Sequence, residues 1–397
     1  SNFSFLSGAS QPEELIKAAQ KAGYSALALT DECSLSGVVR AHAEGRRLGF
    51  PVIIGAQVQL SVPGQSPPQA KVAHAHTGAS KPAPDTAPTP TPNPVLPPFK
   101  AASRPNAAVA SSQSALAPSQ STVLRGHVPP QLLLLAQSRR GYGNLAQWIS
   151  VARRRAPKGQ YLAYASDVEG RVPHAPFLAG LPDCFAILLP QPGQRFETVY
   201  AHAMWLKTWF GTERSAIAVE LQHRPRDAGL LAVLQRVAPL VGLPLVACGD
   251  VRMHARSRKP LLDVLTATRL GRPVADCGFE LAANAEAHLR SRERLARLHA
   301  PAWLAESMRI AATCAFSLDE LRYEYPEEIV PAGHTPGSWL RSRTEDGVLV
   351  RFPAGAPPEV RKTIEHELAL IAQLKFEPYF LTVADIVQWA RSQGILC

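Results

Sequence analysis

Acidic side chains follow two of the apolar runs in this sequence. Asp31 and Glu32 come after the apolar residues of ALALTDECSL (26–35), and Asp250 follows LPLVACG (243–249). In parallel α/β folds, functional residues gather at the carboxyl ends of the strands, so these acids can meet at one edge of a sheet. Hard oxygen ligands of this kind are what a hydrolytic metal centre needs. The sequence makes Asp31, Glu32 and Asp250 candidate metal ligands.

More polar residues are predicted at the same edge. They are Gln57, Glu220, Gln222, His223, Asp250, Arg252 and His254. At the side-chain period of two of an extended strand, the last three would point the same way. As a metal site the set is poor, because Gln57 is a weak neutral ligand and Arg252 is a fixed cation. The alternative interpretation, polar residues that cap strand ends and loops, is therefore favoured.

Two further features are weaker candidates for chemistry. Cys33 follows the acids, but adjacent carboxylates raise a thiol pKa and no histidine stands beside it, so we interpret it as a structural thiol. His74 and His76 form a His-x-His pair in a Pro-rich segment, where ligands would not be held in geometry. The sequence contains no GxxxxGK[ST] or GxGxxG loop, which gives no support to a P-loop or a Rossmann cofactor site.

The elements that must position these residues are short apolar runs alternating with helical patterns. The runs, continuous as in strands buried on both faces of a parallel sheet, are 24–30, 51–60, 132–138, 185–190, 216–222 and 243–251. Residues 10–23 predict a helix with Ser10 as N-cap, Pro12 in the first turn and Glu13 three residues after the cap. Further helical patterns cover 34–48, 142–155, 198–209, 227–241 and 260–270. This alternation predicts an α/β sheet or barrel.

The composition of the chain changes at residues 61–122, and the predicted secondary structure changes after about residue 275. Residues 61–122 hold thirteen prolines and only five charged residues, and such a segment cannot bury enough apolar area to offset its ordering entropy. We expect a disordered, partly polyproline loop there. After about residue 275 helical patterns without strands follow, at 284–298, 301–315 and 359–374. A second domain is predicted to begin between 275 and 335.

The composition of the sequence limits which binding partners and which cellular location are expected. The formal charge of +10 over 397 residues favours an anionic partner, although an Arg-rich enzyme with no such partner is an open alternative. Basic clusters occur at 139–140, 153–158, 252–259 and 290–297, and the sequence does not single out one as a DNA contact. Six widely spaced cysteines without a CxxC pair indicate reduced thiols. With no long apolar run and no signal peptide, we expect a cytoplasmic location and no membrane partner.

Seven blocks of the sequence, taken in order, resemble bacterial DNA polymerases of the C family, relatives of the DNA polymerase III alpha subunit. The blocks are SNFSFLSGAS, ALALTDECSLSGVVRAH, IIGAQVQL, RRGYGNLAQWISVARRRAPKG, VELQH, GDVRMHARSRKPLLDVLTATRLG and EHELALIAQLKFEPYFLTVADIVQWARSQGILC. DECSL and RSRKPL resemble the error-prone, damage-inducible branch. The resemblance implies an α/β fold, a distorted seven-stranded β/α barrel called the PHP domain (polymerase and histidinol phosphatase), at 1–60 and 123–275. It also implies the disordered Pro-rich insertion 61–122, a helical connector 276–335, and the mostly helical beginning of a truncated polymerase palm and thumb region, 336–397.

The resemblance also bears on the metal ligands. The family's first ligands, a His-x-His, would lie before Ser1, and Ser7, Gln57 and Arg252 stand where further ligands are needed. Only Asp31 and Asp250 keep ligand character, with Glu32 where a histidine is common. The implied metal site is vestigial and unoccupied, and no cofactor is assigned to this chain. In the C-terminal block, Ala384 replaces the family's histidine.

For the whole protein, the resemblance implies an error-prone DNA-directed DNA polymerase acting in damage-induced mutagenesis and translesion synthesis. Two Mg²⁺ ions would activate the primer 3′-hydroxyl and stabilise the leaving pyrophosphate. The family's palm aspartates would lie beyond Cys397, so no catalytic residue is expected in this chain and the chain alone is expected to be inactive. Implied partners are the DNA primer-template, deoxynucleotides, the sliding clamp and mutasome accessory proteins. An active metal-dependent phosphoesterase, or a truncated non-functional gene product, are the alternatives.

Overall fold

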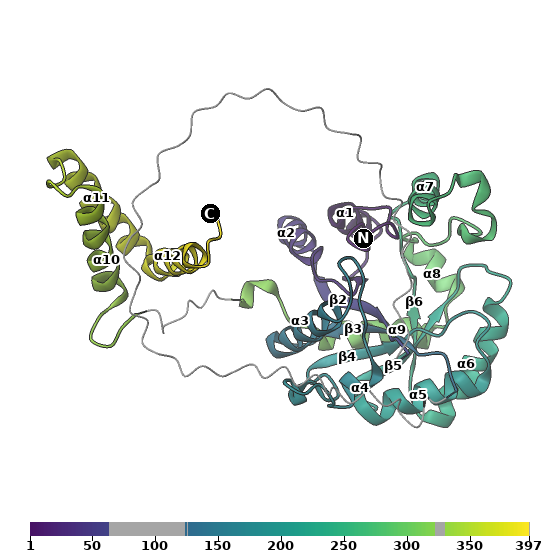
Figure 1. The fold of residues 1–397 in the computed structure, drawn as a ribbon. Coiled ribbons are helices and arrows are strands. Elements are labelled where there is room, and N and C mark those ends of the chain that lie inside the picture. The colour runs from purple at the N-terminus through teal and green to yellow at the C-terminus, as the bar shows by residue number, and fades with distance from the viewer. Residues whose placement is uncertain (63–123, 125, 322–329, 397) are drawn as a thin grey trace. The chain divides into compact units, whose positions relative to one another are not determined.

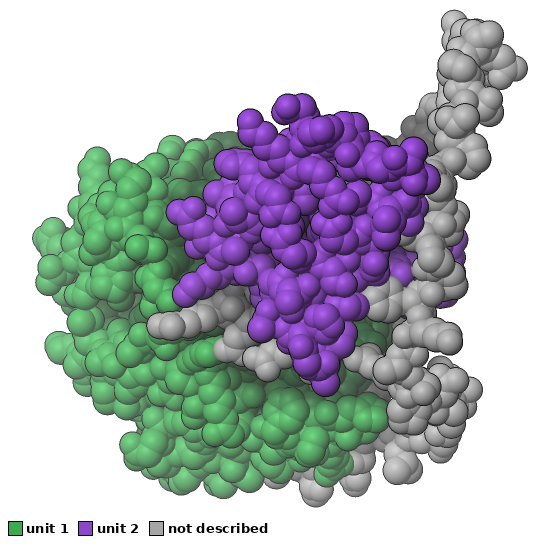
Figure 2. All heavy atoms as spheres, turned by 90° about the vertical axis from the view of Figure 1, so that its left-hand side faces the viewer, with its two compact units in different colours: residues 1–76, 113–321 green, residues 77–112, 322–397 purple. Residues whose placement is uncertain are grey.

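A computed structural model describes residues 1–62, 124, 126–321 and 330–396 (Figure 1). The chain divides into two compact units, residues 1–76 with 113–321 and residues 77–112 with 322–397 (Figure 2). Nearly all of the segment predicted to be disordered, 61–122, lies outside the described residues, as do His74 and His76. The domain boundaries expected from the sequence stay predictions.

In the described part of the first unit, six strands form one curled sheet, in the order of the chain. They are β1 (Leu27–Glu32), β2 (Val52–Gln59), β3 (Gln131–Ala136), β4 (Cys184–Leu188), β5 (Ser215–Glu220) and β6 (Leu245–Cys248). Each overlaps one of the six predicted apolar runs. β1 is parallel to β2, and β4, β5 and β6 are parallel to one another, but β3 is antiparallel to both neighbours. The all-parallel expectation is wrong for β3, because burial on both faces does not encode the direction of a strand.

The helices of the first unit alternate with the strands up to β6 and then follow one another. They are α1 (Pro12–Lys21), α2 (Val38–Leu48), α3 (Arg139–Arg154), α4 (Ala165–Val168), α5 (Phe196–Phe210), α6 (Asp227–Val241), α7 (Lys259–Leu270), α8 (Arg292–Leu298) and α9 (Pro301–Thr313). Short 3-10 turns lie at Pro176–Leu178, Arg256–Arg258, Val274–Asp276, Gly278–Glu280 and Leu318–Glu320. The α/β alternation is confirmed. The helix predicted over 284–298 is wrong for its first half, since α8 begins only at Arg292.

The start of α1 lies one residue later than predicted. Gln11 is the N-cap, and its backbone nitrogen donates to the Glu14 carboxylate at 2.8 Å. Ser10, the predicted cap, instead pairs its hydroxyl with Nδ1 of His254 at 2.8 Å. A distant hydrogen bond therefore takes the place of the local cap, and it ties the N-terminal segment to the chain that follows β6.

Both faces of the sheet are covered, which explains the continuous apolar runs. Neighbouring residues of a strand point to opposite faces, and Ala186 and Ile217 pack into a core with α3, α5 and α6. Phe185, Ala216 and Val246 pack on the other side against α9, through residues such as Ile310 and Cys314. A third cluster joins α1 and α2 to β1 and β2. Figure 1 shows α4, α5 and α6 along one side of the sheet.

The second unit consists of helices in its described part, α10 (Pro336–Arg351), α11 (Pro358–Leu374) and α12 (Glu377–Ser392). Arg341 of α10 forms a bidentate ion pair with Glu365 of α11, at 2.6 and 2.7 Å. The predicted apolar face of α11 holds its partly buried apolar residues, Val360, Ile364, Leu368 and Ile371. No helix within the described ranges combines the length and the apolar character that crossing a membrane requires.

Candidate functional site at the end of the sheet

Asp31 ends in a nest of donors from the first four residues. Its Oδ1 accepts from the Ser4 nitrogen and hydroxyl at 3.0 and 2.8 Å, and its Oδ2 accepts from the Ser1 hydroxyl at 2.7 Å. The side chain is 1% exposed. Gly37 packs so closely that a Cβ there would lie 2.7 Å from Oδ2. A cation could reach this carboxylate only by displacing protein donors.

Glu32, the next residue, is exposed and is tied to a tyrosine. Its Oε1 accepts from the Tyr161 hydroxyl at 3.0 Å, and that hydroxyl accepts from the backbone nitrogen of Gln59 at 3.1 Å. Burial, with the Glu32 charge adding to it, raises the pKa of Tyr161 above its ordinary value, so the phenol stays a donor. Arg153 donates to the carbonyl oxygens of Glu32 and Cys33 at 3.1 Å each, and its guanidinium lies 5.2 Å from the ring centre of Tyr161.

A second acidic pair lies at the ends of β5 and β6, where Glu220 is opposite Cys248 in the sheet register. Burial, and next the charge of Asp250, raise the pKa of Glu220 above its ordinary value. Arg252 opposes this effect, with its Nη2 3.3 Å from Asp250 Oδ2. The charge of Asp250, and to a smaller extent those of Glu220 and Glu32, raises the pKa of Arg252. Arg252 is therefore the cation that these three acids share.

The expectation that Asp250, Arg252 and His254 point the same way is wrong. β6 ends at Cys248, and Asp250 has φ of +41°, a left-handed conformation that breaks the strand period. Arg252 turns back to Asp250, whereas His254 turns to Ser10. A local turn after the strand thus overrides the pattern.

The remaining predicted metal positions supply no strong ligand. Gln57 is beside Glu32 in the register of β1 and β2, and the Ser7 nitrogen donates to the Ser4 carbonyl at 2.9 Å. Among the residues placed by the structure, no hydrogen bond or ion pair joins Asp31 to Asp250, and no group of three His, Cys, Asp or Glu side chains could hold a metal ion. The residues present do not fit a PHP-type metal centre. Whether the protein binds metal stays a prediction.

Cys33 and the other described cysteines are free thiols. Burial raises the pKa of Cys33 to about 12, although Arg153 opposes the shift. A thiol with this pKa is not a thiolate at neutral pH, which is in keeping with the interpretation of Cys33 as a structural thiol.

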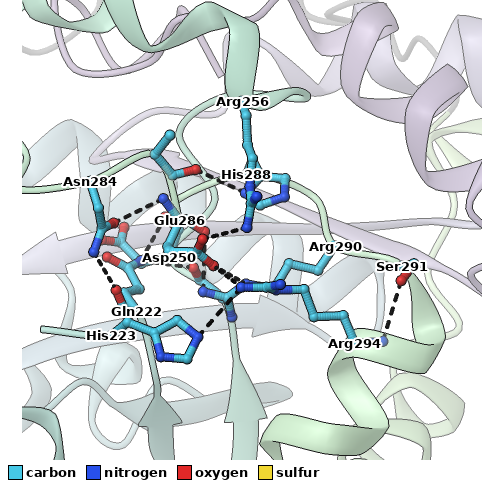
Figure 3. A network of polar contacts seen from close by, with 12 residues as sticks. Gln222, His223, Asp250, Arg256, Asn284, Glu286, His288, Arg290, Ser291 and Arg294 are labelled. Carbon is cyan, nitrogen blue, oxygen red and sulfur yellow. Dashed lines mark hydrogen bonds and ion pairs between the residues drawn. The ribbon is translucent and has the colours of Figure 1, made fainter.

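The basic clusters differ in how far protein groups neutralise them. In the 153–158 cluster, Arg153 is bound to carbonyls, and Arg155 donates to the buried carboxylate of Asp167 at 2.7 Å. The 252–259 and 290–297 clusters meet around Glu286, whose carboxylate contacts Arg256, Arg290 and Arg294 (Figure 3). Only the second arrangement gathers several guanidiniums on one acid.

The loop before α8 links this network to the acidic end of the sheet. The Asn284 side chain donates to the Gln222 carbonyl at 2.7 Å, and Gln222 Nε2 donates to the Gly249 and Asp250 carbonyls at 3.0 and 3.4 Å (Figure 3). The Glu286 nitrogen in turn donates to Asn284 at 2.9 Å. Hydrogen bonds therefore connect the acid that holds the arginines, Glu286, to the candidate site.

Comparison with known protein families identifies the family to which the chain belongs. A family model described as "PHP domain" matches residues 1–223, more than half of the chain. The chain belongs to the PHP domain family. A second model, described as "Bacterial DNA polymerase III alpha NTPase domain", matches residues 338–397. The chain thus joins a PHP domain to the start of a polymerase III alpha domain, as the resemblance implied.

Curated relatives extend over the whole chain. Proteins named "Error-prone DNA polymerase" are 46% identical over 397 residues in Bordetella parapertussis and 45% identical in Dechloromonas aromatica. The chain spans about a third of their length, 32% and 31%. Among solved structures, an amidohydrolase from Chromobacterium violaceum covers 62% of this chain and 84% of its own at 13% identity, with a TM-score of 0.36, too low to support an argument.

The sequence does not predict several of the polar residues that organise the first unit. Ser4 and Tyr161 bind the two acids of β1, and Glu286 organises three arginines, but none stands in a periodic pattern. The one available signal was the pair of arginine-rich segments on either side of Glu286.

Proposed function

We propose that the chain is the N-terminal part of an error-prone DNA-directed DNA polymerase that acts in damage-induced mutagenesis and translesion synthesis. The observation that carries this proposal is the order of two families on one chain, a PHP domain at 1–223 and the start of a polymerase III alpha domain at 338–397. Relatives named as error-prone DNA polymerases match the chain from end to end. Because the chain spans only about a third of them, the activity is proposed for a longer protein.

The catalytic centre of that polymerase is proposed to lie outside residues 1–397. Mg²⁺ held by the palm would activate the primer 3′-hydroxyl and stabilise the leaving pyrophosphate, and none of the residues described for this chain is assigned to it. The partners proposed for the longer protein are primer-template DNA, deoxynucleotides, the sliding clamp and mutasome accessory proteins. The free cysteines are in keeping with a proposed cytoplasmic location.

The PHP domain is proposed to be a metal-free scaffold. Asp31 is saturated by Ser1 and Ser4, and Arg252 supplies positive charge among Glu32, Glu220 and Asp250. A fixed guanidinium there opposes a divalent cation by charge repulsion. In this arrangement the acids hold loops together and Asp31, Glu32 and Asp250 are vestiges of a metal site.

A seventh strand is proposed to close the sheet into the distorted barrel of the family. β1 and β6 are the two ends of the strand order, so each has one edge without a partner strand among the described residues. Residues 1–10 connect these ends, since Ser1 binds Asp31 after β1 and the Ala9 nitrogen donates to the Arg252 carbonyl after β6, at 2.7 Å.

Primer extension tests the proposed function. The 397-residue chain is expected to incorporate no nucleotide, whereas the longer protein is expected to extend a primer across a template lesion with Mg²⁺. Extension by the 397-residue chain alone would place catalysis inside it and contradict the division proposed. A longer protein that binds primer-template but never extends it would contradict the polymerase itself.

An active phosphoesterase is the second candidate, and the acids at the strand ends, Glu32, Glu220 and Asp250, are the observation that favours it. Hydrolysis of phosphomonoesters that depends on added Mn²⁺ or Zn²⁺, and that is lost in an Asp31→Asn and Asp250→Asn double variant, would support this candidate over the scaffold.

A further inference from the structure

Two arginine-rich segments that are 31 residues or more apart in the sequence, 252–259 and 290–297, lie side by side in the fold. The backbone nitrogens of Arg252 and Met253 donate to the Ala287 carbonyl at 3.0 and 3.2 Å. Met253 and His288 form an isolated parallel β-bridge. This connection is made by the backbone, so it fixes the spacing of the side chains that follow on each segment. Arg256 and Arg294 are brought to the same acid, Glu286.

The arginines around Glu286 carry more positive charge than its carboxylate neutralises. Its Oε1 accepts from Arg256 at 2.5 Å, and its Oε2 accepts from Arg294 at 3.0 Å and lies 3.5 Å from a nitrogen of Arg290. One carboxylate therefore faces three guanidiniums, a surplus of two positive charges. Arg290 is buried at 2% exposure, and it also donates to the Glu286 carbonyl at 3.1 Å, so it is part of the protein's interior.

The other two arginines keep donors at the surface. The Arg256 and Arg294 side chains are 50% and 40% exposed, and each guanidinium carries five N–H groups. Nε of Arg294 is buried and has no acceptor within the described part of the chain. The Nη2 of Arg294 is 3.5 Å from Nε2 of His223, a residue held at φ of +54° on the turn after β5 (Figure 3). Glu286 thus orients two guanidiniums and leaves most of their N–H groups unused by it.

We propose that Arg256 and Arg294, held on Glu286 and flanked by His223, form a phosphate-binding site on the first unit. The planar fork of a guanidinium matches the oxygens of a phosphate and binds it bidentately. The phosphate belongs either to the backbone of a nucleic acid or to a free anion such as inorganic phosphate or pyrophosphate. The nucleic-acid source rests on the proposed polymerase function; the phosphate chemistry does not.

Oligonucleotide binding by the 397-residue chain tests the site. Fluorescence anisotropy with a single-stranded oligonucleotide is measured between 50 and 200 mM salt for the wild type and for Arg256→Gln/Arg294→Gln. Two lost phosphate contacts reduce the slope of log affinity against log salt by about 1.4 for a single strand. Over this fourfold range of salt, wild-type affinity then falls by a factor about sevenfold greater than that of the variant.

Matched variants separate the site from general charge and from folding. Arg236→Gln, on α6, removes one exposed arginine elsewhere and is expected to change the slope by no more than about 0.7, the value for one contact. Arg256→Lys/Arg294→Lys keeps the charge but loses the fork, and it is expected to restore the slope but not the full affinity. If the double glutamine variant fails to fold, the double lysine variant decides the question, because it keeps both positive charges beside Glu286: an affinity equal to that of the wild type would overturn the site.

Free anions distinguish the two sources. If inorganic phosphate or pyrophosphate raises the melting temperature of the wild type and not of Arg256→Gln/Arg294→Gln, while the oligonucleotide slopes agree, the ligand is a free anion. If the salt slope of oligonucleotide binding differs between the wild type and Arg256→Gln/Arg294→Gln, the ligand is a nucleic acid. Equal slopes together with equal melting shifts would overturn the site. None of these readouts uses nucleotide incorporation, so a failed primer extension leaves them valid, and their failure leaves the polymerase proposal standing.

Discussion

Arg252 and Asp250 form an ion pair two residues apart, with the guanidinium Nη2 3.3 Å from the carboxylate Oδ2 at the end of the PHP sheet. The pair lies beside Glu220, whose pKa is raised by burial and then by Asp250. An arginine thus neutralises acids at the position where the family resemblance expects a histidine ligand. This relationship leads to the first prediction.

Replacing Arg252 with methionine is expected to destabilise the protein by about 1 kcal/mol at neutral pH, a small value because the arginine is half exposed. The folded-state pKa of Glu220 is above its unfolded value, so folding loses stability as pH rises from the unfolded pKa through the folded one. Arg252 stabilises the ionised form of Glu220, so the stability lost on replacing Arg252 is expected to be larger at pH 9, where Glu220 is ionised, than at pH 5. Urea denaturation at both values measures it, and a loss from Arg252→Met that is equal at both would contradict the account. Arg236→Met serves as the pH-independent control.

His202 is expected to make the free energy of unfolding depend on pH in the acidic range. It is fully buried, its Nε2 donates to the Val128 carbonyl at 2.6 Å, and its Nδ1 is buried without a hydrogen-bond partner in the described residues. Burial lowers the pKa of His202 to about 4, so stability is present above the ordinary histidine pKa, near 6.5, and is lost as pH falls from there toward 4. The loss approaches about 3 kcal/mol.

His202→Gln keeps a donor for Val128 and removes the titration. Its unfolding free energy is expected to change less between pH 6.5 and 4 than that of the wild type. His299, also buried, has its pKa lowered to about 4 by burial and by Arg290, so part of the acid loss is expected to persist. A wild-type slope retained in full by His202→Gln would rule out this assignment.

Glu286→Ala is expected to cost about 3 kcal/mol, because it leaves the buried guanidinium of Arg290 without its carboxylate. Glu293→Ala is the matched control. Glu293 pairs with Arg297, but both side chains are more than 70% exposed, and such pairs contribute between about 0 and 1 kcal/mol. Thermal melts of the two variants compare them directly, and similar losses would show that Glu286 does not neutralise a buried charge.

Two glycines of α3 give opposite predictions for the same substitution. A Cβ at Gly141 would lie 2.0 Å from the Asp183 carbonyl oxygen, so Gly141→Ala is expected to destabilise the protein by about 1–3 kcal/mol. A Cβ at Gly143 meets no heavy atom within 4 Å, and Gly143→Ala is expected to stabilise by about 0.5–1 kcal/mol through helix propensity. Chemical denaturation gives both signs, and a stable Gly141→Ala protein would place α3 differently from the fold described.

The strands could be predicted because their burial leaves a mark in the sequence. Runs such as that around Phe185 and Ile187 are apolar on both faces, and α9 on one side and the α5–α6 core on the other explain why. Strand direction leaves no such mark, which is why the antiparallel β3 was missed. The cap of α1 was misplaced because Ser10 binds His254, 244 residues away, and local preference cannot reveal that contact.

The candidate site could be predicted only as a group of polar strand ends. Glu220 and Asp250 were expected at one edge and they interact there. The partners of Asp31 and Glu32, which are Ser4 and Tyr161, come from a turn and from a loop after α3, where no spacing rule applies. The left-handed turn at Asp250 likewise follows from tertiary packing and cannot be read from a period of two.

Trace-metal analysis of the purified protein tests the central claim, that Arg252 and the serine nest of Asp31 leave the PHP domain a scaffold without metal. After incubation with Zn²⁺ or Mn²⁺ and extensive dialysis, the account predicts far less than one bound ion per chain, with no difference between the wild type and Asp31→Asn/Asp250→Asn. One or more tightly held ions per wild-type chain, lost in that double variant, would contradict it.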